Sequence, residues 1–82
     1  MSDTRPRKRS LNLRGHQTSV SLEDDFWNAF RDIAVAQGLP INELAARIDA
    51  ERALDTGLAT AIRLFVLRHF KEAAHKAVAP DE

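Results

Sequence analysis

The chain lacks the residues on which several classes of small protein depend. Its 82 residues include no cysteine, which excludes a disulfide framework and thiolate metal sites and fits a reducing cytoplasm. No apolar run approaches the roughly 20 residues that span a bilayer, and the basic N-terminus lacks the apolar core of a signal peptide. We therefore expect a single small cytoplasmic domain without a membrane partner, for which dimerisation would enlarge the core.

The sequence also lacks any catalytic or cofactor-binding constellation. It has no glycine-rich phosphate loop and no pairing of a nucleophile with a base. The histidines are dispersed, and His69 and His75 are six residues apart, a spacing that does not suit two metal ligands on one helix face. The acidic run Glu23, Asp24 and Asp25 marks a helix start, where the helix dipole repels cations. We predict no enzyme activity, no cofactor and no metal site.

A formal net charge of zero conceals an uneven charge distribution. Residues 1–14 hold five basic residues against Asp3 alone, a net charge of +4, and the rest of the chain therefore carries −4. We expect a flexible basic arm over residues 1–9, one domain over residues 10–77 and a frayed tail over residues 78–82. The basic end would attract a polyanion and contact its phosphates or the DNA minor groove. The predicted contacts are Arg5, Arg7, Lys8, Arg9 and Arg14.

Residues 17–22 alternate between two kinds of side chain, which predicts a strand with one apolar and one polar face. The two faces consist of Thr18, Val20 and Leu22, and of Gln17, Ser19 and Ser21. A lone strand needs a partner for its backbone groups, and we expect the same strand of a second copy. A two-stranded ribbon with a polar face fits the DNA major groove, so the polar residues are candidate base readers. A solvated strand face accounts for the same pattern.

Leu11 and Leu13 begin a second alternating stretch of opposite parity. Its apolar residues have odd numbers, whereas those of residues 17–22 have even numbers, and a one-residue slip reverses every side chain of a strand. Gly15 must therefore lie at a break, either in an extended arm or at a tight hairpin turn. We favour the extended arm, which leaves residues 17–22 as the intermolecular strand.

Three helices are predicted after this strand. The first spans about residues 24–37, with acidic residues in its first turn and Gly38 as its C-terminal cap. The second spans about residues 40–52, and the third begins after Gly57 and ends near residue 77. The third helix is apolar around most of its circumference, so we expect it to be buried on nearly every side in a dimer core. The predicted dimer core comprises Val20, Leu22, Phe26, Trp27, Phe30, Ile62, Phe65 and Val66.

These elements resemble the ribbon-helix-helix superfamily of bacterial DNA-binding proteins, the group that includes the Arc and MetJ repressors. The similar residues are Thr18-Ser19-Val20-Ser21-Leu22-Glu23-Asp24, the pair Phe26-Trp27, and Ala59-Thr60-Ala61-Ile62-Arg63-Leu64-Phe65-Val66-Leu67. The chain is most similar to short bacterial members in which a TSVSLED strand leads to an aromatic pair and an SSALRLFVL-like helix. The resemblance covers about residues 10–74. It implies a mainly α fold, an intertwined homodimer that shares a two-stranded antiparallel ribbon, with one additional helix.

Superfamily members hold a phosphate at the N-terminus of their second helix, and this chain offers two candidates for that helix. Residues 40–52 begin with proline where a serine is common, so that Ile41 and Asn42 would make the contact. Residues 57–75 are the alternative, with a hydroxyl from Thr56 or Thr60. Superfamily strands often place a cation or asparagine among their base readers, whereas this strand has no cation. Specificity would then depend on Gln17, on Arg14 or on DNA shape.

The sequence therefore predicts a homodimer that binds duplex DNA sequence-specifically, as a bacterial transcriptional regulator of the repressor type. Two-fold symmetry would give pseudo-palindromic half-sites. The alternative hypothesis is a protein-interaction module, antitoxin-like or an adaptor, that uses its ribbon only to dimerise. The two hypotheses differ in whether the basic arm and the polar strand face must lie on one side of the molecule.

Overall fold

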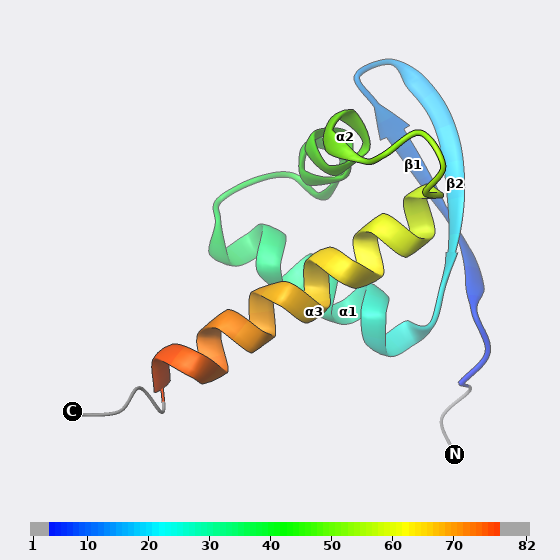
Figure 1. Ribbon diagram of the computed structural model, residues 1–82. Coiled ribbons are helices and arrows are strands. Elements are labelled where there is room, and N and C mark those ends of the chain that lie inside the picture. Colours follow the sequence, from blue (N-terminus) through cyan, green and yellow to red (C-terminus); the bar gives the residue numbers. More distant parts are fainter. Residues whose placement is uncertain (1–3, 78–82) are drawn as a thin grey trace.

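The computed structural model describes residues 4–77, which form a β-hairpin followed by three helices (Figure 1). The elements are β1 (Arg7–Leu13), β2 (His16–Leu22), α1 (Asp24–Ala36), α2 (Ile41–Glu51) and α3 (Leu58–Ala77). The predicted mainly α fold, with a two-stranded ribbon and an additional helix, is confirmed. The predicted frayed tail lies outside the described residues.

β1 and β2 pair antiparallel within the chain through a two-residue turn at Arg14 and Gly15. Both turn residues have positive φ angles, 55° and 93°, as in the type I′ turn that matches the twist of paired strands. The turn places odd-numbered residues of β1 opposite even-numbered residues of β2, for example Leu11 opposite Thr18. The two apolar sets of opposite parity therefore share one face. Gly15 lies at a tight hairpin turn, and the extended arm that we favoured is wrong.

The hairpin also corrects the extent of the arm and gives the ribbon strand a partner within the chain. Arg7, Lys8 and Arg9 belong to β1 and lie opposite residues of β2, so a flexible arm does not reach residue 9. β2 pairs with β1 of the same chain, where the sequence analysis expected β2 of a second copy, and pairing between two copies stays a prediction. Closing a two-residue turn costs little chain entropy, so the neighbouring segment is the readily available partner. One chain thus builds a complete two-stranded ribbon.

α1 ends in a glycine cap that turns the chain towards α2. The Leu39 N–H donates to the Ala34 carbonyl at 2.9 Å, and the Gly38 N–H donates to the Val35 carbonyl at 3.0 Å. Gly38 has a φ of 70°, which a residue without a Cβ adopts at little cost. The predicted cap is confirmed, and α2 starts shortly after it.

The core lies between the inner face of the ribbon and the three helices. Phe30 is fully buried, and its ring centre lies 6.3 Å from that of Trp27 and 6.2 Å from that of Phe65. Complete burial of such a side chain stabilises the fold by roughly 1.5–3 kcal/mol. The residues predicted for a dimer core pack inside one chain: Val20, Leu22, Phe30, Ile62 and Val66 are buried, and Phe26, Trp27 and Phe65 pack against them.

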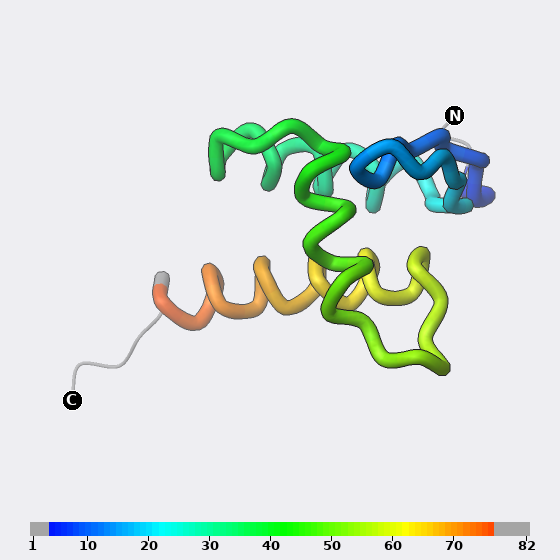
Figure 2. Tube along the Cα trace, turned by 90° about the horizontal axis from the view of Figure 1, so that it is seen from above, coloured from blue at the N-terminus to red at the C-terminus, as the bar shows by residue number. Residues whose placement is uncertain are grey.

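The elements form two layers that α2 links. The ribbon and α1 lie in one layer, α3 forms the other, and α2 crosses between them (Figure 2). α3 buries Ile62 and Val66 on the side that faces the other elements. Leu64, Leu67 and Phe70 remain 38%, 51% and 47% exposed, and we call these three residues the apolar stripe. The single chain thus leaves one side of α3 exposed, and the burial of α3 on nearly every side in a dimer core stays a prediction.

Candidate nucleic-acid interface

The ribbon turns one face to the core and the other away from it. On the second face, which we call the outer face, three polar residues of β1 lie opposite three of β2. The outer face consists of Lys8, Ser10, Asn12, Gln17, Ser19 and Ser21. All are exposed except Asn12, which is half-buried. The structure thus brings the three predicted base readers together on one surface.

Sequence reasoning did not assign Ser10 and Asn12 to this surface. The signal was present, because these residues alternate with Leu11 and Leu13 just as the predicted readers alternate with the core residues of β2. Only the pairing across the turn shows that both polar sets face the same way. Asn12 also stabilises the turn, since its side-chain Oδ1 accepts a hydrogen bond from the Gly15 N–H at 2.7 Å.

The ribbon and the residues that precede it are basic. Residues 4–22 contain five arginines and lysines and no aspartate or glutamate. Lys8 is exposed on the outer face, Arg5 is exposed before β1, and the Arg14 side chain at the turn is 60% exposed. A surface of one sign of charge raises the local concentration of a polyanion.

Two of the predicted phosphate contacts lie on the inner side of β1. Arg9 binds the Asp24 carboxylate, its side chain is 18% exposed, and its guanidinium lies 5.4 Å from the centre of the Trp27 ring. Arg7 Nε lies 3.7 Å from the same Asp24 oxygen. Both cations bind the hairpin to the start of α1. Arg9 is thereby held in the fold, and we leave it out of the proposed DNA contacts, whereas the Arg7 side chain is 55% exposed and stays among them.

A second ion pair connects the start of α1 to α3. The Arg63 guanidinium donates to Glu23 Oε1 at 3.0 Å and to the Ser21 carbonyl at 3.2 Å. The pKa of Glu23 is lowered, first by a hydrogen bond from its own backbone and then by Arg63. Glu23 and Asp24 are therefore neutralised by arginines. These acidic residues, which lie closest to the ribbon in sequence, do little to repel a polyanion.

The N-terminus of α2 lies at the tip of the ribbon. The Asn12 N–H donates to Asn42 Oδ1 at 3.0 Å, and Arg14 donates to Glu43 Oε2 at 2.8 Å. Glu43 also accepts a hydrogen bond from Arg47 at 3.3 Å, and the two guanidiniums lower the pKa of the Glu43 carboxyl. Two arginines against one glutamate leave this tip with a net positive charge. The sequence analysis did not assign Arg47 to the site.

Of the two candidate phosphate-binding helices, α2 is the one whose first turn contacts the ribbon tip. The backbone N–H groups of Ile41 and Asn42 have no partner among residues 4–77. The N–H groups of Glu43 and Leu44 both donate to the Pro40 carbonyl. Near the start of α3, the Thr56 carbonyl accepts a hydrogen bond from Arg52, and Thr60 is exposed. The geometry at the tip therefore favours α2 over α3.

Two other kinds of site are absent from the described part of the chain. Residues 4–77 contain no cluster of three or more histidine, aspartate and glutamate side chains that could hold a metal ion. None of the helices described has the length and hydropathy to cross a membrane.

A family model described as "Ribbon-helix-helix domain" matches residues 6–70, from just before β1 into α3. The chain belongs to the ribbon-helix-helix domain family. Ribbon-helix-helix domains are commonly DNA-binding regulators or antitoxins, and their fold is non-enzymatic.

The ribbon-helix-helix chain is also similar to a solved structure, that of an uncharacterized protein from Bordetella pertussis Tohama I. The two share 28% sequence identity and superpose with a TM-score of 0.71. The similarity covers 93% of this chain and 64% of the Bordetella chain, so this chain spans less than two thirds of that protein's length. No curated protein matches the chain.

Proposed function

We propose that this ribbon-helix-helix protein binds duplex DNA sequence-specifically as a homodimer and acts in the bacterial cytoplasm as a transcriptional regulator of the repressor type. The main observation in support of this proposal is the outer face of the ribbon. It presents six polar side chains in a segment, residues 4–22, that contains five cations and no carboxylate. A two-stranded ribbon is narrow enough for the major groove, where such side chains can read base edges.

The proposed contacts divide into base readers and phosphate contacts. Gln17, Ser19 and Ser21 are the proposed base readers, joined by the β1 residues of the outer face. The proposed phosphate contacts are Lys8, Arg5, Arg7, Arg14 and the backbone N–H groups of Ile41 and Asn42. Because each chain builds its own ribbon, each protomer would read one half-site.

The apolar stripe on α3 supports the homodimer. Leu64, Leu67 and Phe70 lie along one side of the helix, and each is more than a third exposed. Contiguous apolar surface of this kind marks an interaction site in a small protein. The same stripe also favours a second candidate function, that of a protein-interaction module whose partner is a different protein.

Salt-titrated binding to random duplex DNA tests the electrostatic part of the proposal. We expect the wild-type protein to bind with an affinity that falls steeply with salt. Lys8→Ala should reduce the salt slope by about 0.9 per lost phosphate contact in each protomer. Lys71→Ala, at an exposed position of α3 outside the ribbon, is the matched control and should leave the slope unchanged. Salt-independent or absent binding of the wild type would favour the protein-interaction module.

Variants on the two faces of β2 test the assignment of the base readers. Ser19→Ala and Gln17→Ala should change stability by less than about 0.5 kcal/mol, because both residues are exposed. On a duplex selected from a random library, each should cost roughly 1–3 kcal/mol of binding, with little effect on random DNA. Val20→Ser, on the adjacent core position that is 6% exposed, should lower stability instead. The face assignment is reversed if the serine variant melts early while the valine variant does not.

A further inference from the structure

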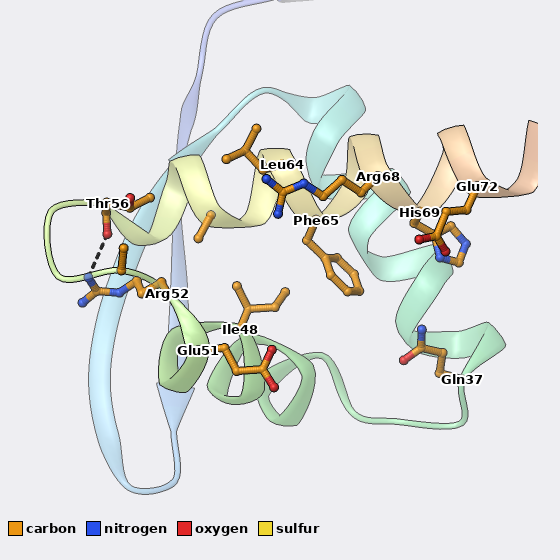
Figure 3. A pocket seen from close by; sticks show the side chains of 12 residues that line it. Gln37, Ile48, Glu51, Arg52, Thr56, Leu64, Phe65, Arg68, His69 and Glu72 are labelled. Atoms are coloured by element: carbon orange, nitrogen blue, oxygen red, sulfur yellow. Dashed lines mark hydrogen bonds between the residues drawn. The ribbon is translucent and has the colours of Figure 1, made fainter.

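A cleft of about 490 Å³, which we call the α2–α3 cleft, separates the C-terminal half of α2 from α3 (Figure 3). Its floor is apolar, since Ile48 lines it from α2 and the Phe65 side chain projects from α3 towards α2 (Figure 3). The Phe65 ring also lies edge-on to the buried Phe30, and the His69 ring lies beside it at 6.5 Å between ring centres. Small-molecule sites have volumes of this order and are mostly apolar with a few polar groups. The cleft therefore offers an aromatic wall to a small apolar group.

The rim of the cleft carries charges of both signs on facing walls. Arg68, on α3, makes no ion pair within the described part of the chain, and its side chain extends back along α3 at the cleft (Figure 3). The lining carboxylates, Glu51 on α2 and Glu72 one turn beyond Arg68, make none there either. The other lining cation, Arg52, is bound to Asp49 at 2.7 Å. One guanidinium and two carboxylates thus remain for a ligand.

These groups match a ligand with three parts. A guanidinium binds a carboxylate through charge-assisted hydrogen bonds, and carboxylates attract an ammonium group. An apolar side chain gains free energy when the floor removes it from water. A free apolar amino acid carries all three parts in one small molecule. An uncharged apolar molecule would leave the charges of the rim unmatched, and a polyanion would be repelled by the two carboxylates.

α2 connects the cleft to the ribbon tip. Its C-terminal half lines the cleft, and its first turn holds the tip through the hydrogen bond from the Asn12 N–H to Asn42 and the ion pair of Glu43 with Arg14. The helix has 11 residues, which span about 16 Å at 1.5 Å per residue. It crosses between the two layers (Figure 2). A molecule held between α2 and α3 therefore acts on the same helix that positions the tip.

We propose that the α2–α3 cleft binds a free apolar amino acid and that this ligand adjusts the DNA affinity of the ribbon through α2. The carboxylate lies at Arg68, the amine at Glu51 and Glu72, and the apolar side chain against Phe65 and Ile48. A ligand acts in this way only if it binds the DNA-bound and the DNA-free protein with different affinities, and DNA then changes the ligand's affinity by the same factor. The effect on DNA rests on the proposed function, whereas the binding site does not.

Titration of the full chain with phenylalanine and with leucine, followed in heteronuclear NMR spectra, tests the site. We expect saturable shifts at the residues that line the cleft and at the Asn12 amide, which reports on the ribbon tip. Phenylalanine amide lacks the carboxylate and N-acetylphenylalanine lacks the amine. Each should bind at least about tenfold more weakly than phenylalanine, because each loses one charged contact. Absence of saturable shifts with both amino acids, or equal affinities for phenylalanine and its two derivatives, would overturn the proposal.

Arg68→Gln tests the place of the carboxylate. The variant should bind phenylalanine at least about tenfold more weakly and phenylalanine amide as the wild type does, because the amide has no carboxylate to lose. A change in the fold of the cleft would instead weaken both ligands. Arg31→Gln is the matched control, since Arg31 is an exposed arginine on α1 that does not line the cleft. It should leave both affinities unchanged. Equal effects of Arg68→Gln on the two ligands would contradict the assignment of the carboxylate to Arg68.

Binding of random duplex DNA, with and without saturating phenylalanine, measures the coupling. The DNA affinity of the wild type should change at least about fivefold, and that of Arg68→Gln should stay constant at the same concentration of phenylalanine. A wild-type DNA affinity that phenylalanine does not change would overturn the effector role. A wild type that binds no DNA would contradict the proposed function, while the NMR titration would still decide the binding site and its effect on Asn12.

Discussion

At the residue scale, two neighbours of like charge have different environments. Lys8 and Arg9 are adjacent in a basic run, yet Lys8 is exposed on the outer face and Arg9 binds Asp24 against the Trp27 ring. The cause is the two-residue period of a strand, which sends successive side chains to opposite faces. A count of basic residues therefore overestimates how many can contact a phosphate.

Glu43→Gln is expected to strengthen non-specific DNA binding. The substitution removes the carboxylate that accepts hydrogen bonds from Arg14 and Arg47, which leaves both guanidiniums available at the ribbon tip. Affinity for random duplex should rise, and the salt slope should steepen by about 1–2 units per protomer, at roughly 0.9 per new phosphate contact. Glu51→Gln removes the same charge at the opposite end of α2 and is the control. Equal effects of the two variants would show that net charge alone matters.

Glu43 should also contribute to acid sensitivity. Its pKa is lowered from the ordinary value of 4.5, first by the hydrogen bond from Arg14 and then by that from Arg47. Since the folded state holds the carboxylate charged, this contribution to stability is present above about pH 4.5 and is lost as the pH falls through the lowered pKa. Denaturant titrations between pH 3 and 7 should show a smaller loss of stability in Glu43→Gln than in the wild type. An unchanged pH profile would contradict this role.

At the scale of the element, the hairpin turn determines which side chains form the outer face. Arg14 and Gly15 both adopt positive φ, and a turn of two residues fixes the register of β1 against β2. A turn longer by one residue would move one strand's polar side chains to the core. The polar surface is therefore a property of the turn as much as of the strands.

Gly15→Ala should destabilise the hairpin. A Cβ at Gly15 would meet nothing within 4 Å, so the cost arises from the φ of 93° and should be about 1 kcal/mol. Gly57→Ala is the matched control. Its added Cβ also meets nothing within 4 Å, and its φ lies outside the left-handed region, so it should be neutral or slightly stabilising. Urea unfolding of both variants makes the comparison, and equal effects would rule out backbone strain at the turn.

At the scale of the whole molecule, one chain contains both a complete ribbon and a core of its own. The residues predicted to form a dimer core are buried or packed within the single chain. A second copy is therefore not needed to complete the ribbon or this core, and the exposed apolar stripe of α3 remains available to the proposed dimer. In the proposed dimer, each chain would therefore fold on its own core before it pairs.

Two N-terminal truncations should behave differently. Deletion of residues 1–5 leaves β1 intact and should cost less stability than the longer truncation, and loss of Arg5 should lower the salt slope by up to about 0.9 per protomer. Deletion of residues 1–9 also removes the strand residues opposite Val20, Ser21 and Leu22 and the two cations bound to Asp24. It should destabilise the fold by at least about 1 kcal/mol, from the lost backbone hydrogen bonds. Thermal melting of both truncations makes the comparison, and equal stability would place β1 outside the fold.

The sequence by itself determined the elements that depend on local pattern. Alternation over residues 17–22 gave a strand and its polar face, helical periodicity gave three helices, and Gly38 marked the end of the first. These features follow from the period of side chains along one segment and from the backbone freedom of one residue, which are local properties. The family resemblance added the ribbon followed by helices, which the structure confirms.

Only the tertiary structure decided how these elements meet. Opposite parity around Gly15 was compatible with an arm or a hairpin, because the sequence does not show which segment completes the hydrogen bonds of a strand. The same holds for Arg9, which pairs with a carboxylate fifteen residues away, and for Asn42, which bonds to the Asn12 backbone thirty residues away. α3 is apolar on most sides, and the packing of the other elements against it determined which side is buried and which side remains exposed. Contacts between segments distant in sequence depend on packing geometry, and the local periodicity of side chains does not determine that geometry.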